Sequence, residues 1–423
     1  MPHLNKLRTA VPGGSGGDTA SLSLARLRTA LTLFFALDGF LFAGWVVRIP
    51  AIKHQTGASA GDLGLALLGV SAGAVVTMTL TGRLCRRFGS HPVTVVSAVL
   101  MSLSIALPPL THSALALGLV LLVFGTAYGG INVAMNSAAV DLVAALRRPV
   151  MPSFHAAFSL GGMIGAGLGG LVAGGLSPTA HLLGLTVAGL LLTAAAGPVL
   201  LRHHVPAPLE SASPGSGAPA SRPPEGRSAR RLDARSRRLV TVFGVIALCT
   251  AYGEGAMADW GALHLEQDLH AHPGVAAAGY AVFALAMTAG RLSGTAMLER
   301  LGQTRTLVAG GATAAGGMLL GALAPTVWLA LLGFAVTGLG LANIFPVAVA
   351  RAGAVAGPAG VAAASTLGYG GMLLGPPAIG FLADWFSLPL ALTTVAALAF
   401  GAALIGYAAR HASAGGGTGR ASE

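Results

Sequence analysis

The sequence predicts an all-α polytopic membrane protein with twelve transmembrane helices in two pseudo-symmetric six-helix bundles. Three observations lead to this fold class. Hydrophobic residues make up 54% of the 423 residues and charged residues only 9%, whereas a soluble domain has about 25% charged residues. Long apolar segments recur along the whole chain. The second half of the chain also repeats motifs of the first half in the same order.

The composition limits what the protein can do. A mean hydropathy of +0.75 leaves too few charges to cover a water-facing surface, but it suits a surface that faces lipid. The two cysteines lack metal-ligand spacing and form no disulfide framework. No Walker motif, HExxH or Ser-His-Asp pattern stands out. We therefore expect a protein that is not an enzyme and that binds no cofactor and no metal.

Each apolar segment is close to the length of about 20 residues that a helix needs to cross a bilayer. The expected spans are 28–47, 63–82, 93–110, 115–139, 154–176 and 180–201 in an N-terminal bundle (27–201), and 239–258, 275–296, 305–324, 327–349, 361–383 and 389–409 in a C-terminal bundle (239–409). The remaining segments are polar. We expect a disordered tail at 1–26, a linker rich in Pro, Gly, Ser and Arg at 202–238, and a C-terminal tail at 410–423.

Basic residues gather in the loops on one side of these spans. Only Arg48 and Lys53 fall on the other side. This asymmetry follows the positive-inside rule, so we expect both termini and the linker in the cytoplasm, and a multi-pass protein of the inner or plasma membrane. The same asymmetry explains the net charge of +11 without nucleic-acid binding.

The internal repeat rests on four pairs of matching motifs. The pairs are Trp45 with Trp260, Arg87-Phe-Gly89 with Arg300-Leu-Gly302, Asn132 with Asn343, and Gly161-Gly-Met163 with Gly370-Gly-Met372. Their offsets fall steadily from 215 (260 − 45) to 209 (370 − 161), as expected for a duplication with small deletions. Both halves begin on the same side of the membrane. Transporters with such parallel repeats bind substrate between the halves, near the bilayer midplane.

The whole chain resembles the major facilitator superfamily. The basic loops Gly82–Gly89 and Met297–Gly302 resemble that family's loop signature between helices 2–3 and 8–9. The first loop has Arg86 where the family usually has an acidic residue, whereas the second keeps Glu299. The resemblance implies that the first helix of each three-helix unit, here helices 1, 4, 7 and 10, lines a central cavity.

Three further motifs resemble a bacterial branch of this family near the fucose permeases. They are Glu254–Trp260, Gly129–Asn136 and Gly340–Pro346. The Arg148-Pro149 and Phe154–Gly162 stretch resembles the same branch. This likeness implies the import of a sugar or a similar small polar metabolite.

Three carboxylates within spans are candidates for proton coupling: Asp38, Glu254 and Asp259. A charge at the centre of a membrane helix costs about 2.5–3.5 kcal/mol on insertion scales, so it is functional by default. Proton uptake would neutralise a charge that must otherwise cross a hydrophobic gate. The alternative is a structural charge that pairs with Arg or hydrogen-bonds between the bundles.

Uncharged polar and aromatic residues are candidates for substrate binding: Tyr128, Asn132, Asn136, Asn343, Trp45 and Trp260. The first three are spaced four residues apart, so they lie along one face of a helix. Their donors and acceptors suit a polyhydroxylated substrate, although hydrogen bonds between helices are an alternative. The tryptophans suit either stacking on a sugar ring or the aromatic belt at the membrane interface.

Charged residues near the cytoplasmic ends are candidates for gating: Asp141, Arg147, Arg148, His155, Glu299, Arg300 and Asp384. Most of them suit salt bridges that break and reform as one bundle rocks against the other. For His155, near a helix start, we expect a structural or gating role rather than proton sensing. The small residues Gly161, Gly165 and Gly169 fall on one helix face and predict close helix packing.

The sequence therefore predicts a monomeric secondary active transporter whose partners are a small-molecule substrate, protons and the lipid bilayer. Its most direct interpretation is proton-coupled uptake of a sugar or similar metabolite. Three alternatives remain open: proton-coupled efflux of small amphipathic compounds, facilitated transport without coupling, and a non-transporting membrane sensor on the same fold.

Overall fold

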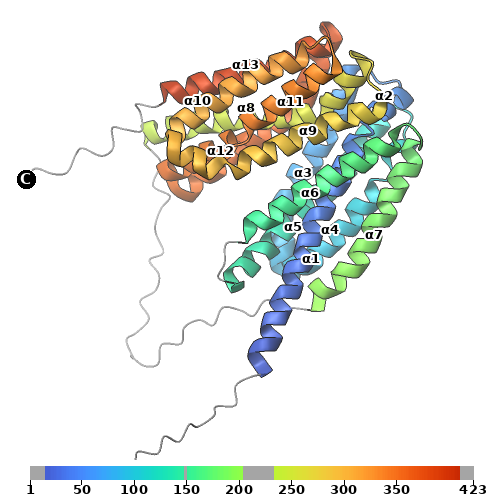
Figure 1. Ribbon diagram of the computed structural model, residues 1–423. Helices are drawn as coiled ribbons and strands as arrows, with labels where there is room; N and C mark the ends of the chain where they lie inside the picture. Colours follow the sequence, from blue (N-terminus) through green and yellow to red (C-terminus); the bar gives the residue numbers. More distant parts are fainter. Residues whose placement is uncertain (1–14, 147–149, 203–232, 410–423) are drawn as a thin grey trace, which may run out of the picture.

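The computed structural model describes residues 15–146, 150–202 and 233–409, and all regular elements within them are helical (Figure 1). The first half holds α1 (Ser15–Val46), α2 (Ile49–Thr56), α3 (Ala60–Phe88), α4 (Ser90–Ser104), the 3-10 helix η1 (Pro108–Leu110), α5 (Ala114–Leu146), α6 (Met151–Ala173) and α7 (Pro178–Arg202). The second half holds α8 (Ala234–Gln267), α9 (Pro273–Leu292), α10 (Gly294–Ala322), α11 (Val327–Leu341), α12 (Ile344–Trp385) and α13 (Leu388–Ala408).

The expected spans all fall on helices, so the all-α membrane fold class is confirmed. Within the described residues, ten segments are long and apolar enough to cross a membrane. The two expected spans that are not among them, 305–324 and 361–383, lie in α10 and α12. Both are rich in Gly and Ala, which makes them less apolar than a span built from Leu, Ile and Val.

The polar tails differ partly from expectation. Helix α1 begins at Ser15, so the expected disorder is wrong for residues 15–26, and 1–14 lie outside the described residues. Helix α8 begins at Ala234, within the expected linker. The linker residues 203–232 and the tail residues 410–423 also lie outside the described part of the chain.

Helix α12 contains a reversal of the chain that separates two of the expected spans. A Cβ atom built on Gly360 would meet the carbonyl oxygen of Ala352, and one on Gly368 would lie 2.6 Å from the ring of Phe345. In a straight helix, residues 345 and 368 would be about 35 Å apart. The arm before the turn therefore continues α11, and the arm after it is the span expected at 361–383.

The internal repeat is visible in the helix packing. Helix α1 packs against α6 and α7 in the first half, as α8 packs against α12 and α13 in the second. Likewise, α4 contacts α5 and α7 in the first half, just as α10 contacts α11 and α13 in the second. The matched glycines Gly89 and Gly302 share a positive φ, 88° and 75°, which only glycine adopts readily.

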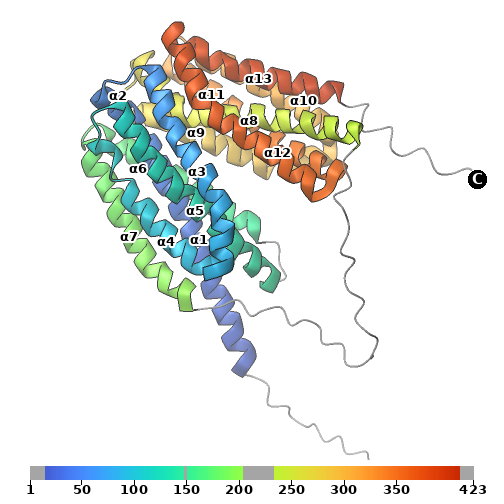
Figure 2. The same cartoon turned by 180° about the vertical axis from the view of Figure 1, so that it is seen from behind.

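The two halves meet through two helix pairs, α3 with α12 and α6 with α9, and through a smaller contact of α2 with α8. Figures 1 and 2 show that the halves converge near α2 and spread apart toward the ends where α1 and α8 begin. We call the first region the α2 end of the molecule and the second the α1 end.

Glycines let the helices approach closely. A Cβ atom on Gly161 would meet the carbonyl oxygen of Ala36 on α1, and one on Gly165 would meet that of Phe40. A Cβ atom on Gly169 would lie 3.1 Å from Val47. The expected packing face of this span is therefore confirmed, and α1 is its partner.

This contact generates a stability prediction. Gly161→Ala forces α1 and α6 apart and should lower the free energy of unfolding by about 1–3 kcal/mol. Gly167→Ala on the same helix is the matched control, because its Cβ would have no atom within 4 Å, and it should be neutral or stabilise by up to about 1 kcal/mol. Unfolding in mixed detergent micelles measures both. Equal stabilities of the two variants would contradict the packing described here.

Candidate transport cavity

A cavity of about 410 Å³ lies between the two halves, within the range of about 300–1,000 Å³ that is usual for small-molecule sites. Helices α1, α3, α5 and α6 line it from one half, and α8, α9 and α12 line it from the other. Helices 1, 4 and 7 of the expected order thus line the cavity, as the family resemblance implied. Helix 10, which is α11 together with the first arm of α12, contributes no lining residue.

An ion pair stands in the cavity wall of the second half. Arg291 on α9 donates a hydrogen bond to Glu254 on α8, with 3.0 Å between Nη2 and Oε1. Asp259 also lines the cavity, and among the described residues no hydrogen bond or ion pair engages it. The phenol of Tyr280 lies within electrostatic reach of all three groups. This wall therefore holds one neutralised carboxylate and one carboxylate without a partner.

The first half supplies the uncharged polar wall. Tyr128, Asn132 and Asn136 all line the cavity from α5, as their spacing predicted. The side-chain amide nitrogen of Asn136 donates to the backbone carbonyl oxygen of Asn132 at 2.7 Å. The side-chain oxygen of Asn136 therefore remains available to a ligand. Tyr128 stacks on Phe42 of α1 with ring centroids 5.2 Å apart. The wall thus combines amides with a flat aromatic surface.

His155 on α6 lines the same cavity, where it lies within electrostatic reach of Arg291 in the other half. Its ring also packs edge-on against Phe35 of α1, with centroids 5.5 Å apart. The gating role expected for His155 remains a prediction, and its position between the halves is compatible with that role.

Asp38 lies just behind the cavity wall rather than in it. The neighbouring Gly39 and Phe42 line the cavity, but the Asp38 side chain is fully buried, and neither carboxylate oxygen has a hydrogen-bond partner among the described residues. A buried carboxylate without a partner is costly in its charged form. The electrostatic field of Asp38 reaches Tyr128, which connects this carboxyl group to the cavity surface.

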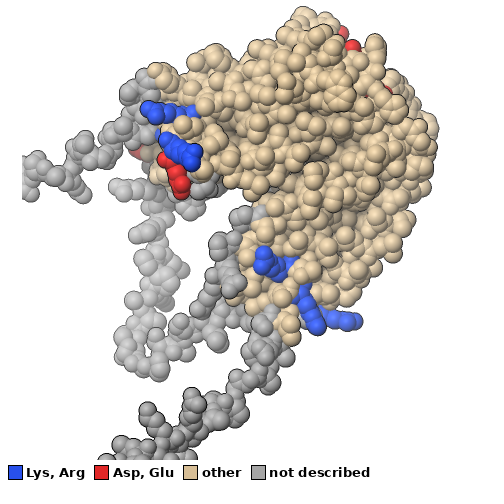
Figure 3. Space-filling model, in the orientation of Figure 1, with Lys and Arg blue, Asp and Glu red and all other residues tan. Residues whose placement is uncertain are grey.

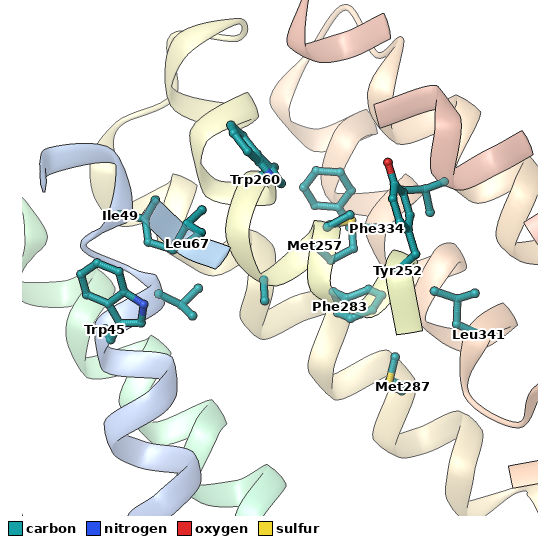
Figure 4. Close-up of a cluster of buried hydrophobic side chains, with 14 of the residues drawn as sticks. Trp45, Ile49, Leu67, Tyr252, Met257, Trp260, Phe283, Met287, Phe334 and Leu341 are labelled. Atoms are coloured by element: carbon teal, nitrogen blue, oxygen red, sulfur yellow. The ribbon is translucent and has the colours of Figure 1, made fainter. Parts of the chain in front are cut away.

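Three of the expected substrate residues lie outside the cavity. The amide of Asn343 donates to the carbonyl oxygen of Gly290 at 2.8 Å, so it joins α9 to the α11–α12 junction. Trp45 and Trp260 are buried among apolar side chains (Figure 4), and neither lines the cavity. Their burial also excludes an aromatic belt for this conformation. These side chains therefore pack and connect helices here.

Among the residues that the structure describes, the salt bridges expected at the α1 end are not formed. Asp141 lies near Cys85 of its own half, where burial and the Asp141 carboxylate raise the pKa of the Cys85 thiol. Glu299 and Arg300 are exposed on α10 and belong to none of the ion pairs found in the described chain. The physical reason is that the halves spread apart at this end. Arg147 and Arg148 lie outside the described residues.

The position expected for Asp384 is wrong. It was predicted to join a cytoplasmic salt bridge, but it lies at the α2 end, where its carboxylate accepts backbone N–H groups at the start of α3. The reason is the direction of the chain, since the eleventh span leaves the α1 end and Asp384 follows at its far end. No basic residue takes part in this contact.

Several cavity residues escaped the sequence reasoning: Ser71, Ser159, Tyr280, Thr288 and Tyr369. For the α9 residues, helical spacing in the sequence indicates a shared polar face. Tyr280, Thr288 and Arg291 are eight and three residues apart, so they share a helix face. This stripe lies on helix 8, outside helices 1, 4, 7 and 10, which the resemblance implies for the cavity.

The exposure of the ion pair predicts that it adds little to stability. The side chains of Glu254 and Arg291 are 28% and 47% exposed, and solvent-exposed pairs typically contribute up to about 1 kcal/mol. A double-mutant cycle with Glu254→Gln and Arg291→Gln, measured by unfolding in detergent, should give a coupling energy below that value. A coupling energy several times larger would contradict a cavity that is open to water at this wall.

Comparison with known proteins places the chain in a family. The model of the Major Facilitator Superfamily (MFS) matches residues 29–258 and 244–421. An uncharacterised MFS-type transporter of Yersinia pestis is 35% identical over 370 residues, which is 86% of this chain and 91% of that protein. The membrane protein MosC of Rhizobium meliloti is 30% identical over 373 residues, covering 88% and 87% of the two chains.

Solved structures show the same fold. The nucleoside transporter NupG, in a mutant form, aligns with a TM-score of 0.72 at 15% identity, covering 90% of this chain and 99% of that one. A bacterial homologue of the human lysosomal transporter Spinster, in an inward-facing and unoccupied conformation, aligns with a TM-score of 0.72 at 13% identity, covering 95% and 98%. Two pseudo-symmetric bundles around a shared cavity, together with these matches along the chain, show that the protein belongs to the Major Facilitator Superfamily of transporters.

Proposed function

We propose that this protein takes up a sugar or a similar small polar metabolite by alternating access, driven by proton entry. The observation that carries the proposal is the shared cavity, whose polar wall comes from one half and whose carboxylates come from the other. A ligand held between both walls would contact both halves at once. Rocking of the halves would then expose it to one side of the membrane and afterwards to the other.

The positions of the carboxylates support proton coupling. Asp38 is buried without a partner, and Asp259 faces the cavity without one, whereas Glu254 is held by Arg291. Protonation of Asp38 removes a charge that is costly to keep buried without a partner. We propose Asp38 as the coupling residue, with Glu254 and Asp259 acting at the substrate site.

The distribution of charge supports the orientation. Arg26 and Arg28 lie in the first half of α1, and Arg235, Arg237 and Arg238 lie near the start of α8. Figure 3 shows Lys and Arg gathered at the ends of both halves, on either side of the gap between them. By the positive-inside rule, we propose that the α1 end is cytoplasmic, so that this structure is closed toward the outside.

Arg48 is an exception to this charge asymmetry because it lies at the α2 end. Its contacts there explain how the charge is held. It is buried, its Nε donates to Nδ1 of His181 at 2.8 Å, and its two terminal nitrogens reach the carbonyl oxygens of Val172 and Ala173. These carbonyls end α6, where the helix dipole favours a positive charge. Arg48 therefore does not argue against the proposed orientation.

A transport experiment tests the proposal. A thermal-shift screen of neutral monosaccharides, inositols and nucleosides identifies a ligand, which is then added outside proteoliposomes that contain a pH-sensitive dye. Ligand-dependent acidification should occur with the parent protein and with Asp233→Asn, a control that removes an exposed charge just before α8, outside the cavity lining. Asp38→Asn should still bind the ligand, because Asp38 lies behind the cavity wall, but it should no longer move protons.

Glu254→Gln should behave differently from Asp38→Asn, because Glu254 lines the cavity and holds Arg291. We expect it to weaken the ligand-induced thermal shift as well as the transport. Proton movement that survives in Asp38→Asn would rule out Asp38 as the coupling residue. A ligand that accumulates without any proton movement would instead indicate facilitated transport.

A second candidate function is the efflux of small amphipathic compounds, favoured by the apolar part of the cavity lining. Phe158, Phe283 and Met287 come from both halves and offer an extended apolar surface. A strain that lacks the gene should then become more sensitive to some compounds in a panel of toxic amphiphiles. Unchanged sensitivity across the panel would remove this alternative.

A further inference from the structure

The start of α3 receives a carboxylate from the other half of the molecule. Asp384, at the end of α12, accepts the backbone N–H of Ala60 at 2.9 Å and that of Gly61 at 2.7 Å. The hydroxyl of Ser59 donates to the same carboxylate at 3.0 Å. These contacts join residues more than 320 positions apart in the chain.

The contact is favourable for two reasons. The first N–H groups of a helix have no partner within the helix, and the positive end of the helix dipole attracts an anion. Asp384 satisfies two of these groups and supplies the charge. Because it belongs to the other half, this cap exists only while the two halves are together at the α2 end.

Helix α3 also carries a cap of its own. Ser59 accepts the N–H of Asp62 at 3.1 Å, and the Asp62 carboxylate accepts the Ser59 hydroxyl at 3.0 Å. That hydroxyl has a single proton, so Asp62 and Asp384 compete for it. When Asp384 leaves, Asp62 takes the whole hydrogen bond and the helix remains capped. The contact between the halves can therefore break without unfolding the start of α3.

Glycines allow the two helices to meet closely enough for this contact. A Cβ atom on Gly61 would lie 2.6 Å from Oδ2 of Asp384, and one on Gly380 would meet the carbonyl oxygen of Ala60. A Cβ atom on Gly64 would meet the carbonyl oxygen of Pro376. Any larger residue at position 61 would displace the carboxylate directly.

We propose that Asp384 is a gating residue, which holds the α2 end closed by capping the N-terminus of α3 across the interface between the halves. Opening of this end requires the carboxylate to leave Ala60 and Gly61 and to be hydrated instead. The inference rests on alternating access, which is part of the proposed function, but it concerns the balance between conformations rather than the substrate or the coupling.

Distance measurements between the halves test this proposal. Spin labels at Gly175→Cys and Leu323→Cys report the width of the α2 end, in a background where Cys85 and Cys249 are replaced by Ser. A Cβ at Gly175 has no atom within 4 Å, and Leu323 is 60% exposed, so both sites tolerate a label. Pulsed dipolar spectroscopy in lipid nanodiscs, without any substrate, gives the ratio of long to short distances.

Two variants should raise this ratio. Asp384→Ala removes the carboxylate. Gly61→Ala displaces the carboxylate but favours the helical state of α3. Because Gly61→Ala does not weaken the helix, a rise of the ratio in both variants cannot be explained by loss of folding. We expect a rise of about tenfold in each, the size of a lost charge-assisted hydrogen bond. Asp384→Asn, which keeps one oxygen acceptor, should give a smaller rise. Asp233→Asn, an equal change of charge just before α8 at the α1 end, should leave the ratio unchanged.

Distance distributions of Asp384→Ala and Gly61→Ala that match the parent would overturn the proposal. Because no substrate is present, this outcome is independent of the transport experiment. If the parent protein transports a solute but the Asp384 variants keep the parent distances, the gating proposal is refuted and the transport proposal stands. A shifted ratio in a protein that moves no solute would support the gate and refute the proposed transport.

Discussion

Direct approach of helix backbones is the interaction on which the rest of this structure depends. Lipid tails are as apolar as leucine, so helices in a membrane gain little by hiding apolar side chains from their surroundings. Contacts such as Gly161 on Ala36 and Gly125 on Val70 bring backbones together, where dispersion forces act over many atoms. The same kind of approach occurs between the halves, at Gly170 and Gly274.

Glycine contacts within a half and glycine contacts between the halves differ in the hydrogen bonds that accompany them. In the proposed alternating access, a glycine contact within a half, such as Gly161 on Ala36, joins helices that move as one body. Between the halves, the glycine contacts at the α2 end are accompanied by hydrogen bonds that have substitutes when the halves part. Asp384 illustrates this, because Ser59 and Asp62 already form a cap that remains after it has gone. The chain thus combines permanent and reversible contacts made from the same residue types.

The parts of the structure that depend on local pattern could be predicted from the sequence. Span positions follow from apolar length, and the repeat follows from motif offsets, so the two-bundle fold was predictable. The helix face with Tyr128, Asn132 and Asn136 was predictable because spacing within one helix decides it. Asn343 was not, because a matching position in the repeat does not fix rotation toward the cavity. Its amide instead reaches Gly290, a contact that no local pattern encodes.

Contacts between distant segments were the hardest to predict. The partner of Asp384 is a helix start rather than a charge, so a search for opposite charges could not find it. The salt bridges expected near the α1 end are not formed among the described residues, and a sequence alone does not say which contacts one conformation holds. The stripe with Tyr280 on α9 follows from spacing within one helix, but that helix is not one that the resemblance implies for the cavity.

The second arm of α12 has a mechanical consequence. Tyr369 lines the cavity and Asp384 holds the start of α3, and the two lie on the same arm, about 22 Å apart along the helix axis. Between them lie Pro376 and Pro377, which lack the N–H groups that would bond to the preceding turn, so the arm bends most easily there. A bend of about 5° at that point moves the carboxylate, which lies about 12 Å further along the axis, by about 1 Å. The cavity wall and the contact with α3 therefore share one helix, with a flexible point between them.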